Sequence, residues 1–445
     1  MSVHLLSVAV LVLVLVLGTV RPVNIGALAL VASFIVGSLV FDESVDEILA
    51  AFPAKIFVLL VGVTYMFSIA TRNGTVNWIV NHAFRALKHR GSLVPWVLYT
   101  LAACISTMGA FSPAVAAILA PVAFSAGKKY GIHSLRMSLI VGLGCIAGSF
   151  SPIGPLGAIV NGVVENAGLQ STPGLLYVWV MGLTTAVAIA TSACVSRLEK
   201  RHVSKTLVPA GGPAFDSPTG SSFDSSRDQT DNPGDDAFQN PDVPQSRHGH
   251  AERLFTLAGI ATMLVGALVF GGDIGFIALT IGVTLSIIFT ESGKHAVKDV
   301  SWGVILLICG VITYIGLLER GGTVDWFGEV IARTGAPLIA AFLILLIGAV
   351  VSAAASTTGI LGMLVPLSVP LIATGNVTAA GLTIALAISC SLVDLSPFST
   401  GGAILMASAP ESERAWNYRG LLTFTGIMIF VGPAVTWLLL VVPGW

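Results

Sequence analysis

Charged residues are scarce in this 445-residue chain, where Asp, Glu, Lys and Arg make up 10% of the positions and hydrophobic residues 55%. A soluble protein carries about 25% charged residues. The mean hydropathy of +0.89 is typical of a chain embedded in a bilayer. The net charge of −1 argues against a nucleic-acid partner. The shortage of charge therefore predicts a membrane protein whose surroundings are lipid.

Cysteines are also few. Their number is odd, and each one lies in or beside an apolar stretch: Cys104, Cys145, Cys194, Cys309 and Cys390. We therefore interpret them as small hydrophobic side chains, and not as disulfides or a metal site.

Ten apolar stretches are long enough to approach or cross a hydrocarbon core of about 30 Å. They lie at 3–20, 24–41, 55–71, 135–167, 174–195, 253–270, 273–290, 301–318, 379–409 and 420–442. The first has neither a basic segment before it nor a small-residue cleavage site after it, so we expect a span that stays in place. Residues 203–251 are rich in Pro, Gly, Ser and Asp, which predicts a disordered linker.

The two halves of the chain are copies of each other. Residues 72–78 recur at 320–326, 24–26 recur at 273–275, and 151–159 recur at 396–404, with offsets of 248, 249 and 245. An ordered set of matches at a nearly constant offset predicts two repeats, 1–200 and 252–445.

Each repeat contains one stretch that is too long for one span and too short for two, 93–127 and 336–374. Small and hydroxyl residues interrupt both stretches midway, at 106–113 and 352–359. Halves of about 15 residues reach only ~22 Å as helices, so we expect re-entrant hairpins. The alternative is one long tilted helix, which would put the flanking charges on opposite membrane faces.

Charge placement predicts the topology. With five crossings per repeat the second repeat is inverted, and 19 of the 22 basic residues fall on the side of the linker. The positive-inside rule makes that side cytoplasmic and puts both termini outside, in a bacterial inner membrane. The segment 76–87 is amphipathic and predicts an interfacial helix on the inner surface, with a copy after Trp326 on the outer surface.

Breaks at 151–157 and 396–402 predict discontinuous helices, because Pro removes a donor and Gly tolerates unusual dihedral angles. Inverted repeats with broken helices indicate a transporter site near the membrane midplane. Free helix N-termini there favour an anion, and free carbonyl groups favour a cation. Neither hairpin nor break contains Lys or Arg, so an anionic substrate would depend on backbone N–H groups, hydroxyls and a bound cation.

Polar side chains at these places are the candidate site residues. Hydroxyls at the hairpin tips, an amide beyond the first break and a hydroxyl in the second break are candidates for substrate binding: Ser112, Ser356, Thr357, Thr358, Asn161 and Ser399. Candidates for cation coupling are Asp394, Ser106, Thr107, Ser151, Ser352 and Ser396. Asp394 is the one acid predicted deep in the membrane, as a proton carrier or cation ligand, or as a structural helix cap. Its counterpart in the first repeat is Ser149.

The motifs at 148–159, 396–404 and 356–359 resemble the ion transporter superfamily. The chain is most similar to MatC-type dicarboxylate (malonate) carriers, and less similar to divalent anion:sodium symporters and CitMHS-type citrate carriers. In the symporters each hairpin tip carries Ser-Asn-Thr, and both matching positions here, 111–113 and 356–358, lack the Asn.

The resemblance implies further site residues and an assembly. It adds Pro113, Gly154, Pro155, Thr400 and Gly401 to the substrate site, and would place Na⁺ at Ser112, Gly154, Ser356 and Asp394. It also implies a homodimer in which an elevator-like transport domain moves against a scaffold.

These patterns together predict an all-α transporter without a cofactor that takes up malonate or a four-carbon dicarboxylate with Na⁺ or H⁺. A second hypothesis is a cation/proton antiporter or oxyanion exporter with Asp394 as proton carrier. A third is an intramembrane hydrolase, which would lack a histidine partner and a second aspartate. A channel is the fourth, although channels do not need inverted broken-helix repeats.

Overall fold

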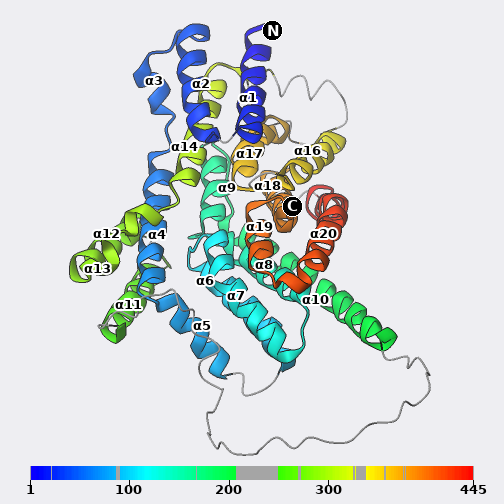
Figure 1. The fold of residues 1–445 in the computed structure, drawn as a ribbon. Helices are drawn as coiled ribbons and strands as arrows, with labels where there is room; N and C mark the ends of the chain where they lie inside the picture. The colour runs from blue at the N-terminus through cyan, green and yellow to red at the C-terminus, as the bar shows by residue number, and fades with distance from the viewer. Residues whose placement is uncertain are drawn as a thin grey trace, which may run out of the picture.

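The computed structural model describes the chain outside residues 1, 22, 87–90, 167, 207–248, 269–271, 324–325, 327–336, 355–356, 374, 376 and 444–445. Within the described part every regular element is a helix (Figure 1). Five helical stretches are long and apolar enough to cross a membrane, at 54–72, 173–197, 302–320, 379–408 and 411–441, and shorter apolar helices accompany them. The prediction of an all-α, multi-pass membrane protein is confirmed.

The predicted spans and hairpins of the first half correspond to helices. In order these are α1 (Ser2–Val20), α2 (Ile25–Val40), α3 (Val45–Ala50), α4 (Ala54–Arg72), α5 (Thr75–Ala86), η1 (Gly91–Leu93), α6 (Val94–Thr107), α7 (Ser112–Tyr130), α8 (Ser134–Ser149), α9 (Pro155–Asn166) and α10 (Pro173–Thr206). The predicted hairpin 93–127 consists of α6 and α7, which pack against each other. The predicted span 135–167 consists of α8 and α9, separated at 150–154.

The described elements of the second half are also helices and helical turns. They are α11 (Gly249–Leu268), α12 (Ile274–Ile288), α13 (Thr290–Gly293), η2 (Ala296–Asp299), α14 (Trp302–Arg320), α16 (Pro337–Ser352), α17 (Thr357–Ala373), α18 (Ala379–Leu392), η3 (Val393–Leu395), α19 (Thr400–Ser408), η4 (Glu411–Glu413), α20 (Arg414–Thr436) and the π-helical turn η5 (Trp437–Val441). α16 and α17 again pack against each other, and α18 and α19 are separated by η3 and a short turn.

Local sequence explains where equivalent helices begin. The Asn24 side chain caps α2 by accepting hydrogen bonds from Gly26 N at 2.9 Å and Ala27 N at 3.2 Å. Asp273 caps α12 in the same way, accepting from Phe276 N at 3.1 Å. A polar side chain at this position satisfies backbone N–H groups that have no partner within the helix.

Two helix pairs cross between the halves at glycine. α2 packs against α14, and α12 packs against α4. A Cβ on Gly26 would lie 1.9 Å from the carbonyl oxygen of Leu306, and one on Gly62 would lie 2.3 Å from that of Gly275. Only glycine permits such an approach, so the sequence specifies both crossings.

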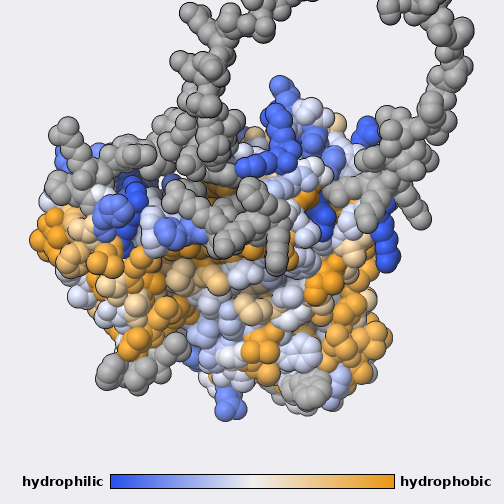
Figure 2. Space-filling view, turned by 90° about the horizontal axis from the view of Figure 1, so that it is seen from below, coloured by the Kyte–Doolittle hydropathy of each residue, from blue (hydrophilic) through white to orange (hydrophobic). Residues whose placement is uncertain are grey.

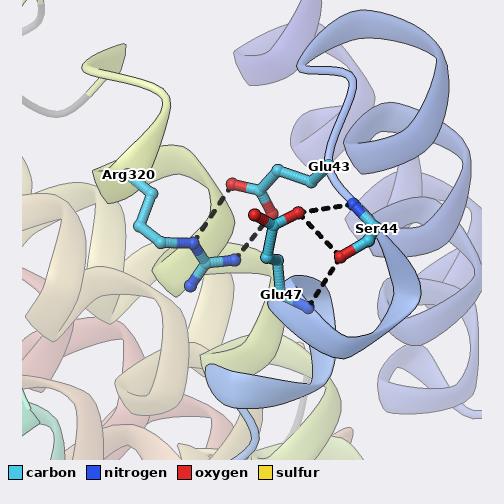
Figure 3. A network of polar contacts seen from close by, with 4 residues as sticks. All are labelled: Glu43, Ser44, Glu47 and Arg320. Carbon is cyan, nitrogen blue, oxygen red and sulfur yellow. Dashed lines mark hydrogen bonds and ion pairs between the residues drawn. The ribbon is translucent and has the colours of Figure 1, made fainter.

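Two arginines at equivalent positions make ion pairs with the opposite half. Arg320 at the end of α14 donates to both oxygens of Glu43, at 2.8 and 3.1 Å. Arg72 at the end of α4 pairs with Asp299 in η2. Figure 3 shows the first pair beside the capping box in which Ser44 and Glu47 begin α3. These bonds from Ser44 hold the pKa of Glu47 below its usual value.

The arrangement in space separates the two hairpins. In Figure 1 α6 and α7 lie in the lower half of the molecule, and α16 and α17 lie in the upper half. The start of α1 lies at the top. The C-terminal end of α10 and the whole of α11 lie in the lower part. α7 packs against α19, and α17 packs against α9, so each hairpin contacts the broken helix of the other half.

The lower end of the molecule has an apolar rim. Figure 2 shows this end, where strongly hydrophobic side chains gather along the sides and less hydrophobic ones lie toward the middle. A lipid-facing rim around a more polar centre agrees with a bundle embedded in a bilayer.

The structure differs from the predicted boundaries near the linker. α10 extends to Thr206 and α11 begins at Gly249, so both helices enter the predicted linker 203–251. Residues 207–248 lie outside the described part. The predicted interfacial segment 76–87 forms α5, except for its last residue, which is not described. Nearly all of its predicted copy after Trp326 also lies outside the described residues.

Candidate functional site

The tip of the first hairpin lies against the break between α8 and α9. α6 ends at Thr107, Gly109 turns the chain with a φ of 105°, and α7 begins at Ser112. The hydroxyl of Ser112 hydrogen-bonds the hydroxyl of Ser149, the last residue of α8. Ser149 in turn donates to the carbonyl of Cys145 at 2.6 Å. The tip is thus joined to the end of the broken helix through one pair of hydroxyls.

A second set of bonds ties this break to the hairpin. The Ser151 hydroxyl donates to the carbonyl of Thr107 at 2.7 Å, and the Thr107 hydroxyl hydrogen-bonds that of Tyr177 in α10 at 2.9 Å. A Cβ on Gly148 would lie 2.2 Å from the carbonyl oxygen of Ala103. This close approach brings the ends of α6 and α8 together.

The tip of the second hairpin lies against the second break. The Ser352 hydroxyl donates to the carbonyl of Cys390 at 2.8 Å and lies 3.0 Å from the hydroxyl of Thr357. The Thr357 hydroxyl also lies 3.3 Å from that carbonyl. The Ser399 hydroxyl donates to the backbone carbonyl of Asp394, and the Asp394 side chain lies near the side chains of Thr357 and Ser399. The acid therefore connects a hairpin tip to the start of α19.

The two tips use equivalent positions. Adding 245 to the residue numbers converts Thr107, Ser112, Cys145 and Ser149 into Ser352, Thr357, Cys390 and Asp394. The hydroxyl pair Ser112–Ser149 thus corresponds to the pair Thr357–Asp394. The first contact is neutral, whereas the second contains the carboxyl group, so the two halves of the site differ in charge.

Eight helix ends gather around these contacts. α7, α9, α17 and α19 begin there, and α6, α8, α16 and α18 end there. The halves meet where Leu395 of η3 covers Gly142 of α8, on which a Cβ would lie 2.1 Å from Leu395 Cδ2. N-termini supply free N–H groups and C-termini supply free carbonyls, so the region offers partners to an anion and to a cation.

The remaining predicted residues have various surroundings. Pro113 and Pro155 lie in the first turns of α7 and α9, where proline costs no helical hydrogen bond. Thr358 is buried. The hydroxyl of Ser106 is buried and has no hydrogen-bond partner. Asn161 donates to the carbonyl of Gly157 in its own helix at 2.7 Å.

The other predicted residues lie in the breaks or outside the described part. Ser399 caps α19 by accepting from Gly402 N at 3.3 Å, and Ser396 accepts from Phe398 N at 3.2 Å. Thr400 is exposed at the start of α19. A Cβ on Gly401 would lie 3.2 Å from Asp394 Oδ2, and one on Gly154 would lie 2.4 Å from the carbonyl oxygen of Ser149. Ser356 lies outside the described residues.

Sequence reasoning missed two residues that hold the tips. Ser149 was recognised as the counterpart of Asp394 but not as a site residue, although the offset of 245 already paired it with Asp394 as it paired Ser112 with Thr357. Tyr177, which bonds Thr107 from α10, carries no signal in the sequence. The atoms around both tips that could bind a cation are oxygens. Oxygen atoms are the ligands that alkali and alkaline-earth cations prefer. Within the described residues no group of three or more His, Cys, Asp or Glu is placed to hold a metal ion.

Comparison with known families finds one match, in the first third of the chain. Residues 1–149 match the family model described as "Dicarboxylate carrier protein MatC N-terminus". The resemblance to MatC-type carriers is confirmed. The match covers a third of the chain and ends at Ser149, so it includes the first hairpin but neither Asp394 nor the second hairpin. A search of curated proteins finds no match to the chain.

Proposed function

We propose that this protein is a secondary carrier that takes up malonate or a four-carbon dicarboxylate together with Na⁺ or H⁺. The single observation that carries the proposal is the paired contact of hairpin tip and helix break, Ser112 with Ser149 and Thr357 with the carbonyl of Cys390, one turn before Asp394. The match of residues 1–149 to the MatC family supports a dicarboxylate as the substrate class.

The chemistry of the two contacts explains how an anion and a cation would share the site. Helix N-termini and hydroxyls can bind a carboxylate without a basic side chain. A half-buried aspartate next to that carboxylate would repel it unless a proton or a cation neutralised the aspartate. Substrate binding and cation binding at Asp394 would therefore favour each other, which is the requirement for coupled uptake.

The crossings between the halves support an inverted-repeat architecture. Gly310 on Gly26 in one pair and Gly62 on Gly275 in the other are the same contact with the halves exchanged. The ion pairs of Arg72 and Arg320 follow the same exchange. In this proposal the helices at these crossings form a scaffold, and the hairpins with the broken helices move as an elevator in a homodimer. The linker would be cytoplasmic and both termini outside, in a bacterial inner membrane.

Uptake into proteoliposomes tests the proposal. Labelled malonate, succinate, citrate and phosphate are offered with a Na⁺ gradient or a pH gradient imposed separately. Uptake of a dicarboxylate driven by one of the two gradients is expected. Protein-free liposomes are the control, and a reconstituted protein that moves no dicarboxylate under either gradient would contradict the proposal.

The second candidate function is a cation/proton antiporter or an oxyanion exporter, and the half-buried position of Asp394 at the second helix break is the observation that favours it. In that case Na⁺ or phosphate, and no dicarboxylate, would exchange across the same vesicles. The same assay therefore separates the two candidates.

A further inference from the structure

Buried polar atoms without a hydrogen-bond partner are concentrated on two helices. Seven such side-chain atoms occur among the described residues, and five of them belong to α8 and α20. They are the hydroxyls of Ser134, Ser138 and Thr425 and both polar atoms of the Asn417 amide. Asn417 and Ser138 are each 0% exposed. We call these four residues the polar seam.

Contacts at one end bring the starts of α8 and α20 together. Ser134 N donates to Glu413 Oε2 at 2.8 Å, and the ring of His133 lies edge-on to Trp416 with centroids 3.7 Å apart. A Cβ on Gly420 would lie 2.2 Å from Leu135 Cδ2. Glu413, Trp416 and Gly420 therefore face the start of α8. Asn417 lies four residues after Glu413 and three before Gly420, a spacing that puts it on the same face of α20.

From this end both helices lead to the turn that carries Asp394. On α8, Ser134, Ser138 and Gly142 follow each other at intervals of four residues along one face, and Gly142 is covered by Leu395. On α20, Thr425 lies eight residues beyond Asn417, which is about 12 Å. One turn further, Met428 packs against the cluster that contains Val393. The seam thus extends from Glu413 toward η3, which contains Asp394.

Unpaired buried groups of this kind are costly. A buried donor or acceptor without a partner has lost its bonds to water without replacement, and native proteins satisfy such groups with ordered water. Water bonded to several polar groups in a row also conducts protons, as in the relays of pumps and transporters.

We propose that ordered waters occupy the polar seam and carry protons between the Glu413 end of the molecule and the carboxyl of Asp394. This inference rests on the proposed function and selects the proton as the coupling ion. A proton enters from bulk water, each water accepts one proton and releases one, and the last transfer converts the Asp394 carboxylate into a neutral carboxylic acid. The reverse transfer restores the carboxylate.

The charged and titratable groups along this route are few among the described residues. His133 and Glu413 lie at its mouth, where His133 Nδ1 and Glu413 Oε2 are 3.4 Å apart. The side chain of Arg136 extends to Ser192 of α10, with Nε 3.0 Å from the hydroxyl. Cys145 of α8 and Thr357 of α17 lie near Asp394, and the Ser399 hydroxyl bonds the Asp394 backbone carbonyl at the start of α19.

Thiol accessibility tests the water independently of transport. In a variant whose five native cysteines are replaced by alanine, Ser138→Cys is exposed to methylmercury in detergent and its mass is recorded over time. Ile140→Cys is the matched control, because Ile140 is equally buried on α8 but on another face. The expected result is that Ser138→Cys reacts and Ile140→Cys does not. Equal protection of both would show a dry seam and overturn the inference.

Transport by Thr425→Val tests the proton route. Removing this hydroxyl should lower pH-driven dicarboxylate uptake about ten-fold, equivalent to about 1.4 kcal/mol, while substrate exchange without a gradient stays at the wild-type rate. Thr423→Val is the control, because its hydroxyl is exposed on the same helix and bonds its own backbone at 2.8 Å.

The outcomes distinguish a failure of the water route from a failure of the proposed carrier function. Unchanged pH-driven uptake in Thr425→Val, or uptake that needs Na⁺ and no proton, would overturn the water route and leave the carrier intact. Absence of exchange in the wild type would instead refute the proposed function, and the methylmercury result would still report on the water. If Thr425→Val lost exchange as well, Ser138→Ala would make the same comparison from α8.

Discussion

Gly310 lies against the backbone of Gly26, so closely that a Cβ on Gly310 would be 2.0 Å from the carbonyl oxygen of Gly26. The pair forms the crossing of α2 and α14, and Gly62 with Gly275 forms the equivalent crossing of α4 and α12. The crossings connect the first half of the chain to the second.

The first prediction is that alanine at a crossing glycine destabilises the fold. Gly26→Ala forces the helices apart, and overpacking of this kind costs about 1–3 kcal/mol, so the melting temperature in detergent should fall. Gly426→Ala is the control, since a Cβ there meets nothing within 4 Å. Equal melting temperatures of the two variants would show that α2 and α14 are not in such close contact at Gly26.

The second prediction concerns the ion pair of Glu43 and Arg320 (Figure 3). Arg320 is partly exposed, so the pair should contribute at most about 1 kcal/mol to stability. Glu43→Arg places two positive charges together and should lower the melting temperature. The exchange Glu43→Arg with Arg320→Glu should restore most of the loss. Failure of the double variant to recover would mean that the bidentate geometry, and not the charge, matters.

Much of the fold could be predicted from the sequence, because its signals are local or periodic. The apolar runs determine the helices, and the Ser-Pro and Gly-rich segments at 151–157 and 396–402 coincide with the observed interruptions. The linker boundaries were less accurate, since Thr206 and Gly249 are helical although their neighbours are linker-like.

The site could be predicted only in part. The positions of Ser112 and Thr357 follow from the hairpin tips, but their partners depend on how helices pack. Nothing in the sequence indicates that Thr107 bonds Tyr177, or that Asn161 bonds its own helix. The unpaired Asn417 could not be found either, because a lone amide near a helix start is usually solvated.

The third prediction concerns the hairpin tips. Thr357→Val keeps the shape of the side chain but removes the hydroxyl that contacts Asp394 and Ser352. A lost hydrogen bond to a charged partner costs about 1.5–3 kcal/mol, so the dicarboxylate affinity should fall about ten- to a hundred-fold. Ser112→Ala should also weaken binding. Half-saturation constants for substrate exchange provide the measurement, and wild-type values in both variants would remove the tips from the site.

The fourth prediction concerns coupling through Asp394. If this residue carries the proton, Asp394→Asn imitates the neutral form and should abolish pH-driven accumulation while sparing exchange. If it binds Na⁺, the variant should need a higher Na⁺ concentration for uptake. Because Ser399 is the cap of α19, normal coupling with a lower melting temperature would assign Asp394 a structural role in the second break. Gradient-driven uptake, exchange and melting temperature of this one variant separate the three roles.

Counterflow shows directly whether the protein carries dicarboxylates, because the assay needs no ion gradient. Vesicles containing the wild-type protein are loaded with unlabelled malonate, and labelled malonate or succinate is added outside in trace amount. A dicarboxylate carrier should cause a transient accumulation of label inside the vesicles. Unlabelled dicarboxylate added outside should suppress this accumulation, and acetate should not. Vesicles that accumulate no labelled dicarboxylate, yet exchange labelled phosphate or Na⁺, would contradict it.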